Sequence, residues 1–357
     1  HSGSGTGRPG CRDAHAPTAA GLGIRALSLA VRSGERMLPA ALVLLMAASS
    51  PAPSGGAARP AECAKADGSS GTNAWERAKA PELTQYCEKL ASATAQLVGT
   101  EPVSPEVLTL VDAAIRLRPQ RAPGHALRGR ALARLARYPE AVAAFEEAKK
   151  RDDRALDEPR ALFAFAHALA RAGRRTEGLA AFRALLPRAS RLEAAERGAA
   201  YVEAGLLLLR DGPTQLDDAI AVLREARRQA HDGVHAAALL GLALALERVG
   251  EHDQARALLV EPGKLPKRLE SALAEPRARE VLAVGEPGIE HLLLGVLLEE
   301  ADPARAATAY RTGLERSRVD APPRPASAGG GAEPARGPWD EHTRKRIDAL
   351  SGRKAPR

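Results

Sequence analysis

Apolar residues recur every three or four positions through most of residues 88–318, and short breaks rich in Gly, Pro and Asp interrupt the pattern. This spacing places the apolar side chains on one face of a helix, so it predicts successive amphipathic α-helices rather than strands. Short breaks between such helices favour antiparallel neighbours. The pattern therefore predicts an all-α protein.

The predicted helices also repeat along the chain. Ala141, Phe145 and Ala148 combine small and bulky residues at helical spacing. They lie 34 residues after a similar set, Val107, Val111 and Ala114. The bulky position returns at Phe182, Leu223, Leu259 and Tyr310. Because each recurrence follows another apolar helix, the repeated unit is a pair of helices.

This unit resembles the tetratricopeptide repeat family. The family's small residue in the first helix, and its small and aromatic residues in the second, match Gly129, Ala141, Phe145 and Ala148. The resemblance implies an α-solenoid, a right-handed superhelix of helix–turn–helix units, over residues 88–318. The family's Trp is missing throughout. An insert at residues 262–290 separates the last two repeats and either kinks the superhelix or holds an extra helix.

The first 58 residues predict segments outside the solenoid. Residues 1–30 carry no sustained pattern and are expected to be unstructured. Residues 31–58 combine a short basic segment, an apolar run from Leu38 to Ala48 and a small-residue stretch, as in a secretory signal peptide. The run is too short for a permanent membrane span; a buried hydrophobic helix is the alternative. With the strong Ala, Arg and Leu bias, we expect a bacterial protein, periplasmic or secreted, with no transmembrane segment after signal removal.

Two cysteines, Cys63 and Cys87, lie within or at the end of an N-terminal cap segment, residues 59–87. An even pair suits an oxidising compartment. A disulfide across this spacing would contribute about 3 kcal/mol in the loop-entropy model. We expect the two residues to be bridged, and two free thiols are the alternative.

The C-terminal residues predict a linker and a tail. Residues 319–337 are rich in Pro, Gly and Ala, as flexible linkers are. Residues 338–357 form a basic tail in which Trp339 to Leu350 could form one short helix. Such a helix docks on the fold or on a partner, but terminal position and composition favour a frayed tail.

The net charge of +8 is concentrated at the two ends of the chain. Residues 1–58 contribute +3 and residues 319–357 another +3, which leaves +2 for residues 59–318. Nucleic-acid binding needs concentrated positive charge on the folded part, so we expect no nucleic-acid partner. Within the repeats, residues 101–200 carry +6 and residues 201–318 carry −4. The predicted solenoid therefore has a basic half and an acidic half.

The chain lacks a recognisable catalytic constellation. Gly5, Gly7 and Gly10 match a dinucleotide-loop spacing, but no strand precedes them. His231 and His235 have the spacing of a helical metal pair, yet Gly233 interrupts them and no third ligand is evident. We therefore predict no enzyme activity, no cofactor and no metal.

The resemblance also assigns groove residues, because the first helix of each tetratricopeptide unit lines the concave face. One position in the last turn of that helix is Arg in four successive repeats, here called the Arg ladder: Arg134, Arg171, Arg210 and Arg248. The other predicted groove residues are Arg130, Arg160, Phe163, His167, Val202 and Leu240. Arg forks bind carboxylates bidentately, which predicts an acidic or C-terminal peptide as ligand. Alternatively, each Arg only complements its helix dipole, worth about 0.3–1 kcal/mol.

The resemblance implies a non-catalytic scaffold or adaptor that holds a peptide or a partner's helix in the groove. A polyanion or envelope-surface binder that uses the basic half and the tail is the alternative, and its binding would fall steeply with salt. A catalytic site in the insert is disfavoured because the insert contains no His, Cys or Tyr. Self-association is a further option, since an uncapped terminal repeat exposes an apolar face.

Overall fold

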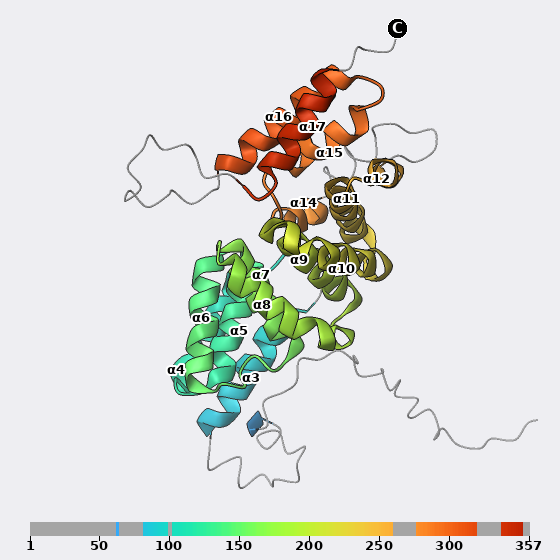
Figure 1. Ribbon diagram of the computed structural model, residues 1–357. Helices are drawn as coiled ribbons and strands as arrows, with labels where there is room; N and C mark the ends of the chain where they lie inside the picture. Colours follow the sequence, from blue (N-terminus) through green and yellow to red (C-terminus); the bar gives the residue numbers. More distant parts are fainter. Residues whose placement is uncertain (1–61, 64–80, 99–101, 260–275, 320–336, 353–357) are drawn as a thin grey trace, which may run out of the picture. The chain divides into compact units, whose positions relative to one another are not determined.

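The computed structural model describes residues 62–63, 81–98, 102–259, 276–319 and 337–352. Within these ranges the chain is helical and forms no strand (Figure 1). Residues 1–30, the predicted signal peptide at 31–58 and most of the predicted linker lie outside the described residues. None of the described helices is both long and apolar enough to cross a lipid bilayer.

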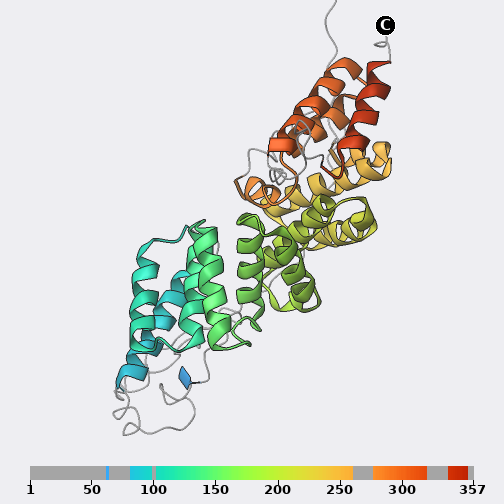
Figure 2. The same ribbon diagram turned by 60° about the vertical axis from the view of Figure 1, so that its left-hand side comes forward.

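Most helices form antiparallel pairs, and neighbouring pairs also contact one another, which makes the fold an all-α solenoid (Figures 1 and 2). The pairs are α3 (Pro81–Gln96) with α4 (Glu106–Leu117), α5 (Ala122–Arg134) with α6 (Tyr138–Arg151), α7 (Pro159–Arg171) with α8 (Arg175–Leu185), α9 (Ala194–Asp211) with α10 (Leu216–Gln229), α11 (Asp232–Val249) with α12 (His252–Leu259), and α15 (Ile289–Leu298) with α16 (Pro303–Val319). Helices α14 (Pro276–Leu282) and α17 (Asp340–Ser351) stand outside these pairs.

Local sequence explains where individual helices begin. Helix α7 starts with Pro159, whose missing N–H costs nothing in the first turn. The preceding Glu158 accepts hydrogen bonds from the backbone N–H groups of Arg160 and Ala161, at 3.2 and 2.9 Å. These bonds satisfy donors that have no partner within the helix. A negative side chain there also complements the helix dipole.

The turns inside three pairs share one geometry. Ala136, Gly173 and Gly250 adopt positive φ angles of 56°, 84° and 94°. In each turn the next residue's N–H donates to a carbonyl five residues earlier, at 2.9 Å, as in Arg137 to Leu132. This arrangement closes a helix C-terminus and favours glycine. Ala136 is the exception, because its Cβ makes the left-handed conformation costly.

Small residues let the two helices of a pair approach. A Cβ added to Gly129 on α5 would lie 2.8 Å from the ring of Phe145 on α6, and one added to Gly295 on α15 would lie equally near Tyr310. Both rings are buried. The small-and-bulky pattern of the sequence therefore corresponds to direct packing between paired helices.

The first pair starts earlier than predicted. Cys63 is joined to Cys87 by a disulfide, so the expected bridge is present. The predicted boundary between residues 87 and 88 falls within α3, and this boundary was wrong. Tyr86 and Cys87 are buried and continue the apolar face of α3, so within the described residues the helical array reaches back at least to Pro81.

The insert and the tail both contain ordered helices. Helix α14 lies in the insert and packs on α9 and α11, burying Val281 and Leu282. Helix α17 packs on α16. The preference for a frayed tail was therefore wrong: Trp339 and Leu350 are buried and hold residues 338–351 against the repeats.

Candidate functional site

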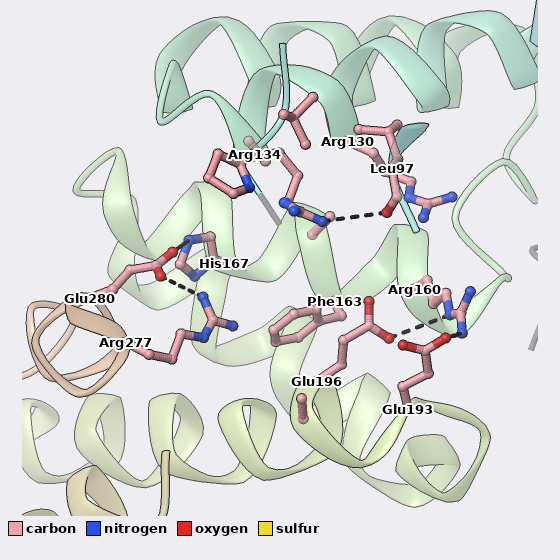
Figure 3. Close-up of a pocket in the computed structure, with 15 residues that line it drawn as sticks. Leu97, Arg130, Arg134, Arg160, Phe163, His167, Glu193, Glu196, Arg277 and Glu280 are labelled. Atoms are coloured by element: carbon pink, nitrogen blue, oxygen red, sulfur yellow. Dashed lines mark hydrogen bonds and ion pairs between the residues drawn. The ribbon is translucent and has the colours of Figure 1, made fainter. Parts of the chain in front are cut away.

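One cavity of about 270 Å³ lies among α5, α7, the start of α9 and α14 (Figure 3). Five of the predicted groove residues line it together: Arg130, Arg134, Arg160, Phe163 and His167. Its other lining residues are Leu97, Pro102, Val103, Ala133, Ala164, Glu193, Ala195, Glu196, Arg277 and Glu280. Its volume is close to the lower end of ligand pockets, about 300–1,000 Å³.

Arg160 is neutralised by carboxylates at the start of α9. Its guanidinium contacts Glu193 and lies 3.4 Å from a carboxylate oxygen of Glu196. Both acids stand at the N-terminus of α9, where negative charge complements the helix dipole. Only 7% of the Arg160 side chain is exposed. Arg160 therefore anchors α7 to α9 rather than offering a free cation.

The opposite wall is held by contacts between α7, α9 and α14. His167 Nδ1 lies 2.8 Å from Oε2 of the buried Glu203 on α9. His167 Nε2 lies 4.0 Å from Glu280 Oε1 on α14, and Arg277 pairs with the same Glu280 at 2.5 Å. Figure 3 shows His167 and Arg277 converging on this carboxylate. These contacts fix α14 as one side of the cavity.

Arg134 and Arg130 project from the α5 side. Arg134 donates to the Leu97 carbonyl at 3.4 Å and has a further partner. Arg130, by contrast, donates no hydrogen bond to any residue that the structure describes, and no dashed line reaches it in Figure 3. Burial lowers the pKa of Arg130, and the carboxylates of Glu158 and Glu196 offset this only in part.

Glu196, which also lines the cavity, has a carboxylate oxygen without a hydrogen bond to any described residue. Its Oε2 is buried and accepts no hydrogen bond among the described residues, although Arg160 lies nearby. Burial raises the pKa of Glu196, while the Arg160 and Arg130 cations oppose this rise. Beside these groups, Phe163 supplies an apolar wall. The cavity therefore combines a guanidinium that makes no hydrogen bond among the described residues, a carboxylate and an aromatic ring, as a site for a small polar group with an apolar neighbour does.

The remaining five predicted groove residues do not line this cavity. Val202 and Leu240 are buried in the core between helix pairs. Arg171 donates to the Glu280 carbonyl at 3.4 Å and lies over the Tyr138 ring. Arg210 donates to the Gly285 carbonyl at 2.8 Å. Both cations thus bind carbonyls at or just beyond the end of α14, where helices leave acceptors unsatisfied.

Arg248 is covered by the C-terminal arm, defined here as residues 337–352. Its side chain is 1% exposed and donates to Thr343 Oγ1 at 2.8 Å. It also lies 3.2 Å from Glu286 Oε2 and over the Trp339 ring. All four members of the Arg ladder therefore bind other parts of the same chain, which neither the ligand interpretation nor the helix-dipole interpretation foresaw.

Several cavity residues were missed by sequence reasoning. Glu193 and Glu196 carry only a helix-start signal, since acids are common in first turns. Arg277 and Glu280 belong to the insert, which lies outside the repeat pattern. Within the described residues, no group of three or more His, Cys, Asp or Glu is placed to hold a metal ion.

No protein-family model and no curated protein matches the sequence. Among solved structures, the chain is similar to YrrB, a TPR protein with an unusual peptide-binding site, with 18% identity, a TM-score of 0.39 and coverage of 59% of this chain and 97% of YrrB. It is also similar to TTC0263, a thermophilic TPR protein of Thermus thermophilus, with 20% identity, a TM-score of 0.33 and coverage of 64% and 98%. At these scores the fold assignment rests on the helix pairs described above.

Proposed function

We propose that this protein is a non-catalytic interaction scaffold that binds a peptide segment of a partner in the cavity between α5, α7, α9 and α14. The observation that carries the proposal is Arg130, a partly buried cation that lines the cavity without a hydrogen-bond partner among the described residues. Partial burial of a cation that makes no hydrogen bond costs free energy, which the charges of Glu158 and Glu196 offset only in part. A ligand carboxylate or carbonyl that accepts from its fork would remove that cost.

The proposed ligand is a peptide with one acidic group followed by an apolar side chain. Arg130 would take the acidic group, and Phe163 and Val103 would contact the apolar side chain. A single guanidinium without a hydrogen-bond partner among the described residues favours one acidic residue over a long acidic tract.

The ion pairs of the basic half favour this ligand over a polyanion. Arg128 pairs with Asp112, and Arg137 and Arg174 each contact nearby glutamates. Polyanion binding depends on many cations free to neutralise phosphate or sulfate groups. In the C-terminal arm, Arg346 pairs with Glu299 in the same way.

We further propose that the protein works in the bacterial envelope or is secreted. The disulfide between Cys63 and Cys87 supports this proposal, because such bonds persist in oxidising compartments and are rare in the cytosol. The signal-peptide pattern at residues 31–58 points the same way.

The test is selection of peptides by the full chain from a random library, followed by titration of the selected peptides. We expect the selected sequences to share an acidic residue beside an apolar one. Arg130→Gln should then weaken binding at least about tenfold, which is about 1.4 kcal/mol. Arg116→Gln is the matched control, because it removes the same charge from an exposed position on α4.

Two results would contradict the proposal. One is an equal loss of affinity in Arg130→Gln and Arg116→Gln. The other is sequence-independent binding of heparin that exceeds peptide binding and collapses as salt rises, which would favour the polyanion alternative.

A further inference from the structure

The C-terminal arm packs against the ends of α9, α11 and α15, each of which is the first helix of its pair. Trp339 Nε1 donates to the Leu209 carbonyl near the end of α9, at 2.6 Å. That carbonyl belongs to the last helical turn, where acceptors lack partners within the helix. The Trp339 residue is 4% exposed. The arm therefore starts with an anchored aromatic residue far in sequence from its partner.

Polar contacts continue along α17. His342 Nε2 lies 3.0 Å from Oε1 of the buried Glu247 on α11. Thr343 accepts from Arg248, also on α11, and Arg346 pairs with Glu299, which follows α15. Each contact joins a side chain of the arm to a charged side chain of the repeats, and Glu247, Arg248 and Glu299 are all buried.

The arm is amphipathic. Ile347 and Leu350 are buried on the same side as these contacts. Glu341 and Lys345 pair with each other on the opposite side, with 81% and 75% of their side chains exposed. An aromatic anchor, polar contacts to buried charges and a solvated outer face are the features of a helix bound in a groove.

We propose that this surface, formed by Leu209, Glu247, Arg248 and Glu299, is a second binding site, and that the arm occupies it as an intramolecular ligand. The partner it fits is a protein segment of the arm's chemistry: a Trp, then a hydroxyl and a His one helical turn later, then an Arg and two apolar residues on the same helix face. Such a segment replaces the arm. This inference stands apart from the cavity at Arg130 and does not depend on it.

The tether sets how strongly a partner must bind. The composition of residues 319–337 predicts a linker, and a ligand joined to its site by a linker acts at an effective concentration of up to about millimolar. A free segment with the same contacts therefore binds the intact chain far more weakly than it binds a chain whose own arm is impaired. This difference provides the test.

The experiment measures fluorescence anisotropy of a labelled peptide of residues 337–352 added to full-length chains. The Trp339→Ala chain should bind the peptide at least about tenfold more tightly than the parent chain. The Lys345→Ala chain is the matched control, because it changes an exposed arm residue, and it should behave like the parent. A peptide with Ala in place of Trp should bind none of the chains.

Equal binding by the Trp339→Ala and parent chains, with unchanged helicity, would overturn the proposal and make the arm a fixed part of the fold. If Trp339→Ala fails to fold, the same question is tested with the parent chain carrying a protease site within residues 320–336. After cleavage, the labelled peptide should exchange with the arm. Retention of the original arm against excess peptide would overturn the proposal in the same way.

Discussion

The Arg248 guanidinium lies 5.1 Å from the centre of the Trp339 ring, although the two residues come from segments far apart in the sequence. A cation over an indole face is favourable, and more so when both groups are buried. Arg248 stands at the repeat position expected to face a ligand. In this chain that position binds the C-terminal arm, while the equivalent surface near α5 keeps an open cavity.

Replacing Arg248 should strongly destabilise the fold. Arg248→Leu leaves the buried Glu247 without its nearest cation, and removing one member of a buried ion pair costs about 3–5 kcal/mol. Urea unfolding monitored by circular dichroism measures the loss. Arg228→Leu is the control, because its pair with Glu225 is largely exposed and should contribute no more than about 1 kcal/mol. Similar losses in both variants would contradict this role.

The turn residues Ala136 and Gly173 give two predictions of opposite sign for the free energy of unfolding. Ala136→Gly should raise the free energy of unfolding by about 0.5–1 kcal/mol, because glycine removes the strain of a positive φ. Gly173→Ala should lower it by about 1 kcal/mol. A Cβ at Gly173 meets no atom within 4 Å, so the cost arises from the backbone alone. Changes of the same sign in both variants would show that the two turns are not equivalent.

The helix pairs were predictable because they depend on local signals. The spacing around Gly129 and Phe145 marks both the helices and the contact between them. The position of the C-terminal arm on the repeats has no such local sequence signal. The hydrogen bond from Trp339 to the Leu209 carbonyl joins segments whose separate sequences give no indication of each other. Sequence patterns report which face of a helix is apolar, but they do not report what covers a polar end.

The disulfide should stabilise the first helix pair. Replacing both Cys63 and Cys87 by Ser should lower the free energy of unfolding by about 3 kcal/mol in the loop-entropy model. The parent chain in reductant should match the double variant, whereas reductant should leave the variant unchanged. Urea unfolding with and without reductant tests this. A parent chain insensitive to reductant would show that the bridge adds no stability.

His252 predicts a pH dependence of stability. Burial, with the nearby Arg346 cation, lowers the pKa of His252 below its ordinary value, although Glu299 and Glu247 oppose this shift. The unfolded chain therefore takes up the proton at higher pH than the folded chain. Stability should fall as pH drops from 7.5 to 5.5, and it should fall less in His252→Gln. Equal pH slopes in unfolding experiments, or a parent chain that gains stability on acidification, would contradict this sign.

The candidate cavity was predictable in part. Arg130, Phe163 and His167 followed from their repeat positions, because those positions place side chains on the same face of successive helices. The role of each Arg did not follow. Arg160 and Arg130 have the same side chain, and only the structure shows that Arg160 forms ion pairs with acids at the start of α9 while Arg130 feels the charges of Glu158 and Glu196 without hydrogen bonding to them.

The most direct test of the account is one titration series with a library-selected peptide against three full-length variants: Arg130→Gln, Arg171→Gln and Arg210→Gln. We expect at least about a tenfold loss of affinity for Arg130→Gln alone. The other two should keep their affinity within about twofold and lose about 1–3 kcal/mol of stability, because their cations bind carbonyls near the end of α14. Equal affinity losses in all three variants would contradict the distinction between Arg130, which is available to a ligand, and Arg171 and Arg210, which bind carbonyls of the same chain.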